Sequence, residues 1–276
     1  MAFHFALSTL DFNPLMVNAQ SSIVNQKPPR LWEIDTLRGA AVVAMMFFHF
    51  MWDLYFFNLT TQNIVGASWQ TFARGIGTTF IFLLGVSVTL DYSRMVAKGI
   101  SPFTRTLRRG LTVFGCGLIV SVATYFALPG EWVRFGILHH AGVAIILAFF
   151  FMRLPVPVNL VIGGALIALG SYIGGLRGAT SEWLIPLGFV PNGVGMADYY
   201  PLLPWFGVAL LGVATGKWLY PNGQRQFALP DVGNFILFRV LRFLGRHSLI
   251  VYLLHQPILI ALIIASGLVP LSQLGF

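Results

Sequence analysis

The chain has very few charged residues and almost no cysteine. Charged residues make up 9% of its 276 positions, whereas a soluble domain needs about a quarter to cover its surface. The single cysteine, Cys116, excludes an intramolecular disulfide framework. The sequence also lacks the GxGxxG, P-loop and GxSxG motifs of dinucleotide, nucleotide and hydrolase sites. No two histidines follow an HxxxH or HxxH pattern, so we expect no metal site.

Apolar residues, in contrast, are abundant. They make up 57% of the chain, and the mean hydropathy is +0.78. A helix that crosses a hydrocarbon core of ~30 Å needs roughly 20 such residues, and continuous apolarity favours helices over the alternating strands of a barrel. The sequence therefore predicts an all-α, polytopic integral membrane bundle of about seven transmembrane helices, near Leu37–Phe57, Phe72–Tyr92, Gly110–Leu128, Phe135–Met152, Val156–Gly174, Leu202–Tyr220 and Ser248–Val269.

The net charge of +8 does not indicate a nucleic-acid partner, because the basic residues lie in the connections between apolar runs. With the N-terminus placed in the cytoplasm, 14 of the 17 Lys and Arg residues face inward, so the positive-inside rule predicts N-in and C-out. Residues 1–30 are polar and lack the pattern of a signal peptide. We expect them to form a mobile cytoplasmic tail before a membrane domain at 31–276.

Four polar side chains lie on one face of the first predicted span. At 100° per residue, Asp35, Arg38, His49 and Asp53 fall within about 60° of arc. Intramembrane ionisable groups are costly, and they usually mark functional sites or protein-packed interiors. Because Arg38 begins the span, His49 lies roughly 16 Å deeper in the membrane. The face therefore lines a cavity or an interhelical contact rather than lipid.

Within this face, Asp53 follows His49 at i+4. A carboxylate in that position can accept a hydrogen bond from one imidazole nitrogen and raise the basicity of the other. This is the arrangement of a general base and the group that orients it. Two alternatives are structural pairing between helices and a proton relay.

Other spans supply further candidates. His139 opens the fourth span and His255 lies in the seventh, whereas His140 points about 100° away from His139. Arginines gather before the third and seventh spans, among them Arg109 and Arg242. They can cradle a phosphorylated donor, or serve as topogenic charge and as contacts for anionic lipid headgroups.

The first span also carries an Arg-x10-His spacing, from Arg38 to His49, that resembles the signature of integral-membrane acyltransferases. The wider chain resembles the bacterial branch of the heparan-alpha-glucosaminide N-acetyltransferase catalytic-domain family over residues 31–260. The matching segments are Asp35-Thr-Leu-Arg38-Gly39, Ala67-Ser68-Trp69, Phe80-Ile-Phe-Leu-Leu-Gly85-Val-Ser, Gly136-Ile-Leu-His139 and Gly245-Arg-His-Ser248 through His255.

The resemblance implies transfer of acetyl from cytosolic acetyl-CoA to an amino sugar on the far side of the membrane. The lysosomal members carry their proposed catalytic histidine just before Ala-Ser-Trp, where this chain has Gly66, and they have Asn at the position of His49. This difference moves the catalytic role to His49 and makes heparan itself an unexpected acceptor. Transfer is either direct or through an acetyl-histidine.

The leading hypothesis is a membrane-bound acyltransferase of the bacterial inner membrane, in contact with lipid and a glycan acceptor. His49 is the base, oriented by Asp53. We expect Arg38, Asp35, Arg109 and Arg242 to bind the donor, and His139, His255, Trp69 and Asp198 to line the acceptor site. The rivals are a transporter or flippase that uses the His–Asp face as a proton relay, and a family member without activity.

Overall fold

The computed structural model describes residues 31–128, 130–174, 181–230 and 235–269. The tail expected at residues 1–30 lies outside this part of the chain. The fold described below is that of the compact unit Trp32–Phe276. Its helices are α2 (Trp32–Phe56), α3 (Ala67–Ala97), α4 (Pro102–Ala127), α5 (Ile137–Phe151), α6 (Val156–Gly174), the 3-10 turns η1 (Glu182–Leu187) and η2 (Pro221–Gly223), α7 (Leu202–Leu219), α8 (Ile236–Arg246) and α9 (Ser248–Ala265).

The predicted all-α membrane bundle is confirmed. Helices α2, α3, α4, α6, α7 and α9 are long and apolar enough to cross a membrane, and α5 is a shorter apolar helix in the expected place. Helix α3 extends beyond the expected range Phe72–Tyr92 at both ends, because a helix can continue past the hydrocarbon layer when its ends carry polar groups such as Asp91 and Arg94.

Close helix contacts in the bundle depend on glycine. On α3, Gly85 lies against the backbone of α7, and Gly212 of α7 lies against the backbone of α3. Gly163 and Gly207 approach each other in the same way between α6 and α7. Small residues let helix backbones approach closely, and this packing takes the place of the hydrophobic effect inside a membrane. Around these contacts the buried core is formed mainly by side chains of α3, α5 and α7, including Ile81, Ala144, Ala148, Leu210 and Val213.

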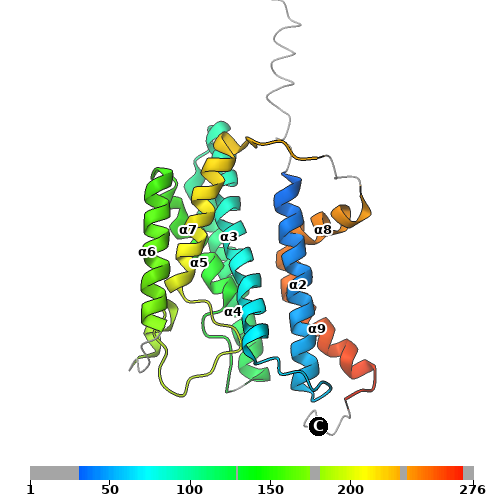
Figure 1. Ribbon diagram of the computed structural model, residues 1–276. Coiled ribbons are helices and arrows are strands. Elements are labelled where there is room, and N and C mark those ends of the chain that lie inside the picture. The colour runs from blue at the N-terminus through cyan, green and yellow to red at the C-terminus, as the bar shows by residue number, and fades with distance from the viewer. Residues whose placement is uncertain (1–30, 129, 175–180, 231–234, 270–276) are drawn as a thin grey trace, which may run out of the picture. The chain divides into compact units, whose positions relative to one another are not determined.

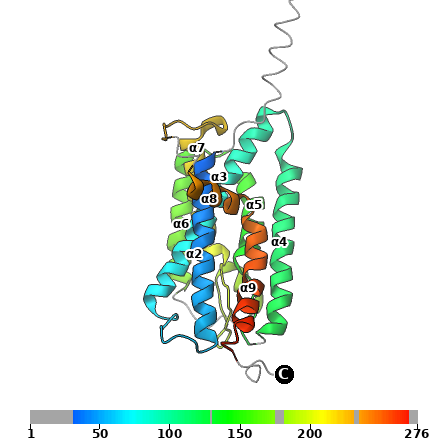
Figure 2. The same ribbon diagram turned by 90° about the vertical axis from the view of Figure 1, so that its right-hand side faces the viewer.

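Helix α2 contacts α8, α9 and α3 (Figures 1 and 2). Helix α8 crosses the first turns of α2, where Gly39 meets the Leu241 carbonyl group and Gly245 meets the Asp35 carbonyl group. The range Pro221–Arg246 lies between two predicted spans and is not itself predicted as a span. It contains a helix because Arg239, Arg242 and Arg246 recur at helical spacing between apolar side chains. Helix α9 follows α8 directly and also packs along α2.

Candidate functional site

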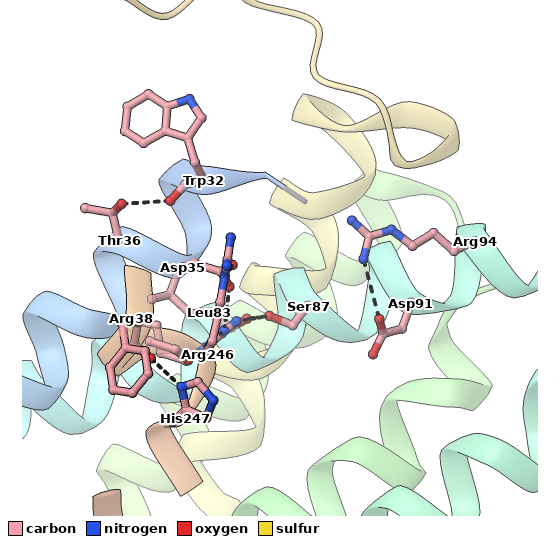
Figure 3. A network of polar contacts seen from close by, with 12 residues as sticks. Trp32, Asp35, Thr36, Arg38, Leu83, Ser87, Asp91, Arg94, Arg246 and His247 are labelled. Atoms are coloured by element: carbon pink, nitrogen blue, oxygen red, sulfur yellow. Dashed lines mark hydrogen bonds and ion pairs between the residues drawn. The ribbon is translucent and has the colours of Figure 1, made fainter. Parts of the chain in front are cut away.

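A network of charged groups joins the first turns of α2 to α8 and α3 (Figure 3). The Asp35 carboxylate lies between two guanidinium groups, because Arg38 Nη1 donates to its Oδ1 at 3.2 Å and Arg246 Nε donates to its Oδ2 at 3.1 Å. Arg38 Nη2 also donates to Ser87 Oγ of α3 at 2.6 Å. The predicted pair Asp35–Arg38 is therefore present, and it fixes the start of α2 against two other helices.

The other predicted donor-binding arginines lie on nearby elements. Arg109 of α4 forms an ion pair with Asp91, which lies one turn beyond Ser87 on α3. Asp91 and Arg109 also line a small hollow together with Arg105 and Thr106. Arg242 Nε donates to the Phe238 carbonyl oxygen of its own helix at 3.3 Å.

The structure pairs His49 with His255 across α2 and α9. His49 Nδ1 and His255 Nε2 are 2.7 Å apart. His255 Nδ1 lies 2.7 Å from the Tyr252 carbonyl oxygen, which can only accept, so this nitrogen carries the hydrogen. Neutral His255 then presents a bare Nε2, and His49 must donate to it through Nδ1–H. It follows that Nε2 of His49 is left with the free lone pair and is available as a base.

Asp53 lies on the predicted helix but has a different hydrogen-bond partner. Its Oδ1 accepts a hydrogen bond from Gln256 Nε2 of α9 at 2.5 Å, and no hydrogen bond joins it to His49. The reason is the packing of α9 along α2. His255 and Gln256 are consecutive residues of α9, and their partners His49 and Asp53 lie one turn apart on α2. The orienting group for His49 is thus His255 rather than Asp53. The sequence signal for Gln256 is its position directly after His255.

His139 caps its own helix. Its Nδ1 accepts from the Gly136 backbone N–H at 3.2 Å, and its Nε2 lies 3.3 Å from Ser121 Oγ of α4. Both ring nitrogens are therefore used locally, and the side chain is only 2% exposed. These contacts connect His139 to the start of α5 and to α4, and none of them joins it to His49.

Asp198 also caps the start of α5. Its Oδ2 accepts from the Ile137 backbone N–H at 2.9 Å and from the Tyr252 hydroxyl at 3.3 Å. Because Gly136 has no side chain to cap the helix, this carboxylate takes the capping place from another segment. Burial raises the pKa of Asp198 to about 6, against the lowering effect of these two hydrogen bonds. Tyr252, which donates to Asp198, lies one helical turn before His255 on α9.

Trp69 belongs to an aromatic cluster at the start of α3. Its ring centroid is 6.3 Å from that of Phe48, whose ring in turn contacts His49 at 5.7 Å. Trp69 also lines a surface hollow with Phe47, Ser68 and Phe72. The predicted acceptor-lining residues therefore lie in different places: His255 directly contacts His49, whereas Trp69 and Asp198 are each connected to the pair through one other residue.

Taken together, a bundle of apolar helices with a buried histidine pair defines a polytopic membrane protein with an ionisable site inside it. The chain belongs to the family described as Heparan-alpha-glucosaminide N-acetyltransferase, catalytic, which matches residues 30–257. This confirms the resemblance expected from the sequence, and the described residues include the apolar helices expected of a membrane protein.

Two curated relatives carry the name heparan-alpha-glucosaminide N-acetyltransferase. The protein of Homo sapiens is 28% identical over 216 residues, which cover 72% of this chain and 29% of that protein. The protein of Mus musculus is 28% identical over 183 residues, 62% of this chain and 26% of that protein. The chain therefore spans less than a third of the length of these relatives. No solved structure matches it.

Proposed function

We propose that the protein transfers an acetyl group from acetyl-CoA to the amino group of a glycan, with His49 as the general base. The observation that carries this proposal is the His49–His255 pair, which leaves Nε2 of His49 unprotonated between apolar helices. The family supports the acetyl group, and the names of the relatives support a glucosaminide amine as the acceptor.

The transfer step balances without a cofactor. The acceptor nitrogen forms a C–N bond to the thioester carbonyl carbon, and the proton that it loses moves to His49 Nε2. The C–S bond then breaks, and the proton passes from His49 to the departing sulfur, so that acetyl-CoA and amine become amide and CoA. While His49 is protonated, its Nδ1–H still donates to His255 Nε2, which stabilises the imidazolium in the place that a carboxylate takes in other catalytic triads.

The charged network supports entry of the donor at the N-terminal end of α2, near Trp32. Acetyl-CoA carries phosphate groups, which guanidinium groups bind well, and Arg38, Arg109, Arg242 and Arg246 lie on helices at this end. With the predicted orientation this end faces the cytoplasm, where acetyl-CoA is made available, and the membrane is the bacterial inner membrane. We expect lipid contacts on the apolar faces and no metal in the reaction.

The test uses the purified full chain, acetyl-CoA with a labelled acetyl group, and glucosamine or a methyl α-glucosaminide as acceptor. We expect His49→Ala to lower the rate of CoA release about 10²–10⁴-fold, since general-base catalysis contributes that much. His247→Ala is the matched control, because the His247 ring lies against Phe243 of the preceding helix turn, with Nδ1 2.8 Å from the Phe243 carbonyl oxygen. We expect it to retain the rate of the parent protein.

Three results contradict the proposal. If His49→Ala and His247→Ala are equally active, His49 is not the base. If the parent protein releases no CoA with any acceptor but carries a solute across vesicle membranes in a proton-dependent way, the histidine pair is the proton relay of a transporter. If neither activity is found in a folded protein, the chain is a family member without activity.

A further inference from the structure

Asp53, one helical turn beyond His49, and its hydrogen-bond partner Gln256 of α9 each carry a buried oxygen atom without a hydrogen-bond donor among the described residues. These atoms are Oδ2 of Asp53 and Oε1 of Gln256. Asp53 is only 3% exposed. A buried carboxylate oxygen without a donor costs several kcal/mol, on the order of the values for other unpaired buried charges. A bound ligand that supplies hydrogens would remove this cost.

The orientation of the Gln256 amide follows from its partner. Because the Asp53 carboxylate can only accept, the atom of Gln256 that lies 2.5 Å from Asp53 Oδ1 must be the amide nitrogen. The oxygen of the same amide is then the atom left unpaired. Both unpaired atoms are therefore acceptors, and one of them belongs to an acidic group.

Two acceptors require two hydrogens from the ligand. A hydroxyl group has one hydrogen and can satisfy only one of the two oxygens, whereas a primary amine has two, or three when it is protonated. A protonated amine also pairs with the charge of Asp53. The chemistry of the two oxygens thus favours an amine over the hydroxyl groups that every sugar carries.

The position of the oxygens fits the acceptor half of the reaction. Asp53 follows His49 at i+4, so it lies on the same face of α2 and roughly 6 Å farther along the helix. The residues that join α2 to the arginine-bearing helix α8, Asp35 and Arg38, lie on the opposite side of His49 along the helix. An amine held at Asp53 is therefore beside the base and on the side away from the charged network.

We propose that Asp53 and Gln256 form the binding site for the amino group of the acceptor, and that they select amino sugars over neutral sugars. This inference rests on the proposed function for the identity of the base beside the site. It replaces the role of Asp53 as the residue that orients His49, because His255 has that role in the structure.

The test measures binding directly, without turnover. The purified full chain in detergent is titrated with glucosamine, and with glucose and N-acetylglucosamine as sugars that lack the free amine. We expect glucosamine to raise the melting temperature and the other two sugars to have no such effect. Asp53→Asn and Gln256→Leu should each weaken glucosamine binding about 10- to 100-fold, the range for loss of a hydrogen bond to a charged group.

Asp91→Asn is the matched control for the charge, since it removes a carboxylate that pairs with Arg94 and Arg109 elsewhere on the protein. It should bind glucosamine as the parent protein does. If Asp53→Asn fails to fold, Gln256→Leu carries the test alone, because it leaves the carboxylate in place. Equal binding by the parent and both variants would overturn the inference.

Two further arms separate the amine from simpler donors. If glucosamine and glucose have the same effect on the parent protein, the site does not select the amine, and the inference is wrong. If sodium chloride stabilises the protein as glucosamine does and competes with it, the site binds a small cation instead. If CoA release depends on His49 but amine binding does not depend on Asp53, this inference is wrong and the proposed function stands. If amine binding depends on Asp53 but the protein releases no CoA, the proposed function is wrong and the amine-binding site stands.

Discussion

At the scale of single residues, the direction of the His49 lone pair is decided by the backbone of another helix. The Tyr252 carbonyl oxygen accepts from His255 Nδ1, His255 Nε2 accepts from His49 Nδ1, and His49 Nε2 keeps the free lone pair on which the proposed function depends. No substitution at position 252 removes a backbone carbonyl group. The tautomer therefore depends on the register of α9 against α2, and a movement of α9 along α2 would change the base as well as the fit of the helices.

The carboxyl group of Asp198 gives a prediction at this scale. Its pKa is raised to about 6 from an ordinary value of 3.8, so the folded protein binds this proton more tightly than the unfolded chain does. The stability that it contributes is fully present below about pH 4 and is lost as the pH rises through about 6. Between about pH 4 and about pH 6, the melting temperature should fall more for the parent protein than for Asp198→Asn. The amide oxygen of this variant can still accept from Ile137 N–H. Melting curves that shift in parallel for both proteins would show that Asp198 does not titrate in this range.

The residue types of the site could be predicted, but not their partners. Helical phase placed His49 and Asp53 on one polar face, since phase depends only on spacing within one helix. The contact between His49 and His255 joins residues about 200 positions apart, and spacing within one helix carries no information about the register of α9. Spacing within α2 alone therefore predicted a hydrogen bond between His49 and Asp53, whereas in the structure Gln256 donates the hydrogen bond to Asp53.

At the scale of helices, the six long apolar helices and the shorter helix α5 were predictable because each is an apolar run. Helix α8 was not predicted, because its apolar and basic residues alternate at helical spacing and no long apolar run marks it. Its place depends on Gly39 of α2 and Gly245 of α8, which let the two backbones meet. This contact also brings Arg246 to Asp35, so the charged network depends on a contact between two small residues.

A substitution at this crossing should therefore destabilise the protein. In Gly39→Ala the new methyl group would meet the Leu241 carbonyl group of α8, and overpacking of this kind costs about 1–3 kcal/mol. Gly75→Ala is the matched control on α3, because a Cβ atom there meets no other atom within 4 Å. Replacing such a helical glycine should stabilise the protein by roughly 0.5–1 kcal/mol. Thermal denaturation in detergent measures both; an equal melting temperature for the two variants would show that α8 does not rest on Gly39.

At the scale of the whole membrane unit, the polar contacts of α2 follow one another along the helix in a functional order. The charged network with Arg246 lies at its first turns, the pair with His255 lies farther along, and the contact with Gln256 comes next. A donor with phosphate groups and an acceptor with an amine would thus approach the base from opposite ends of α2. This order has a consequence for membrane orientation, since the proposed function requires the donor to enter from the cytoplasm.

The orientation can be measured by labelling single cysteines in a Cys116→Ser background. Lys98→Cys places a thiol at an exposed position between α3 and α4, and Asn192→Cys places one at an exposed position between η1 and α7. Because the topology predicted from the sequence assigns 14 of the 17 basic residues to the same side as Lys98, the positive-inside rule predicts that this side is the cytoplasm. A membrane-impermeant maleimide added to intact cells or spheroplasts should label Asn192→Cys at once, and Lys98→Cys only after the membrane is permeabilised. The reverse pattern would place the arginines of α8 on the side without acetyl-CoA and would remove the donor half of the proposed function.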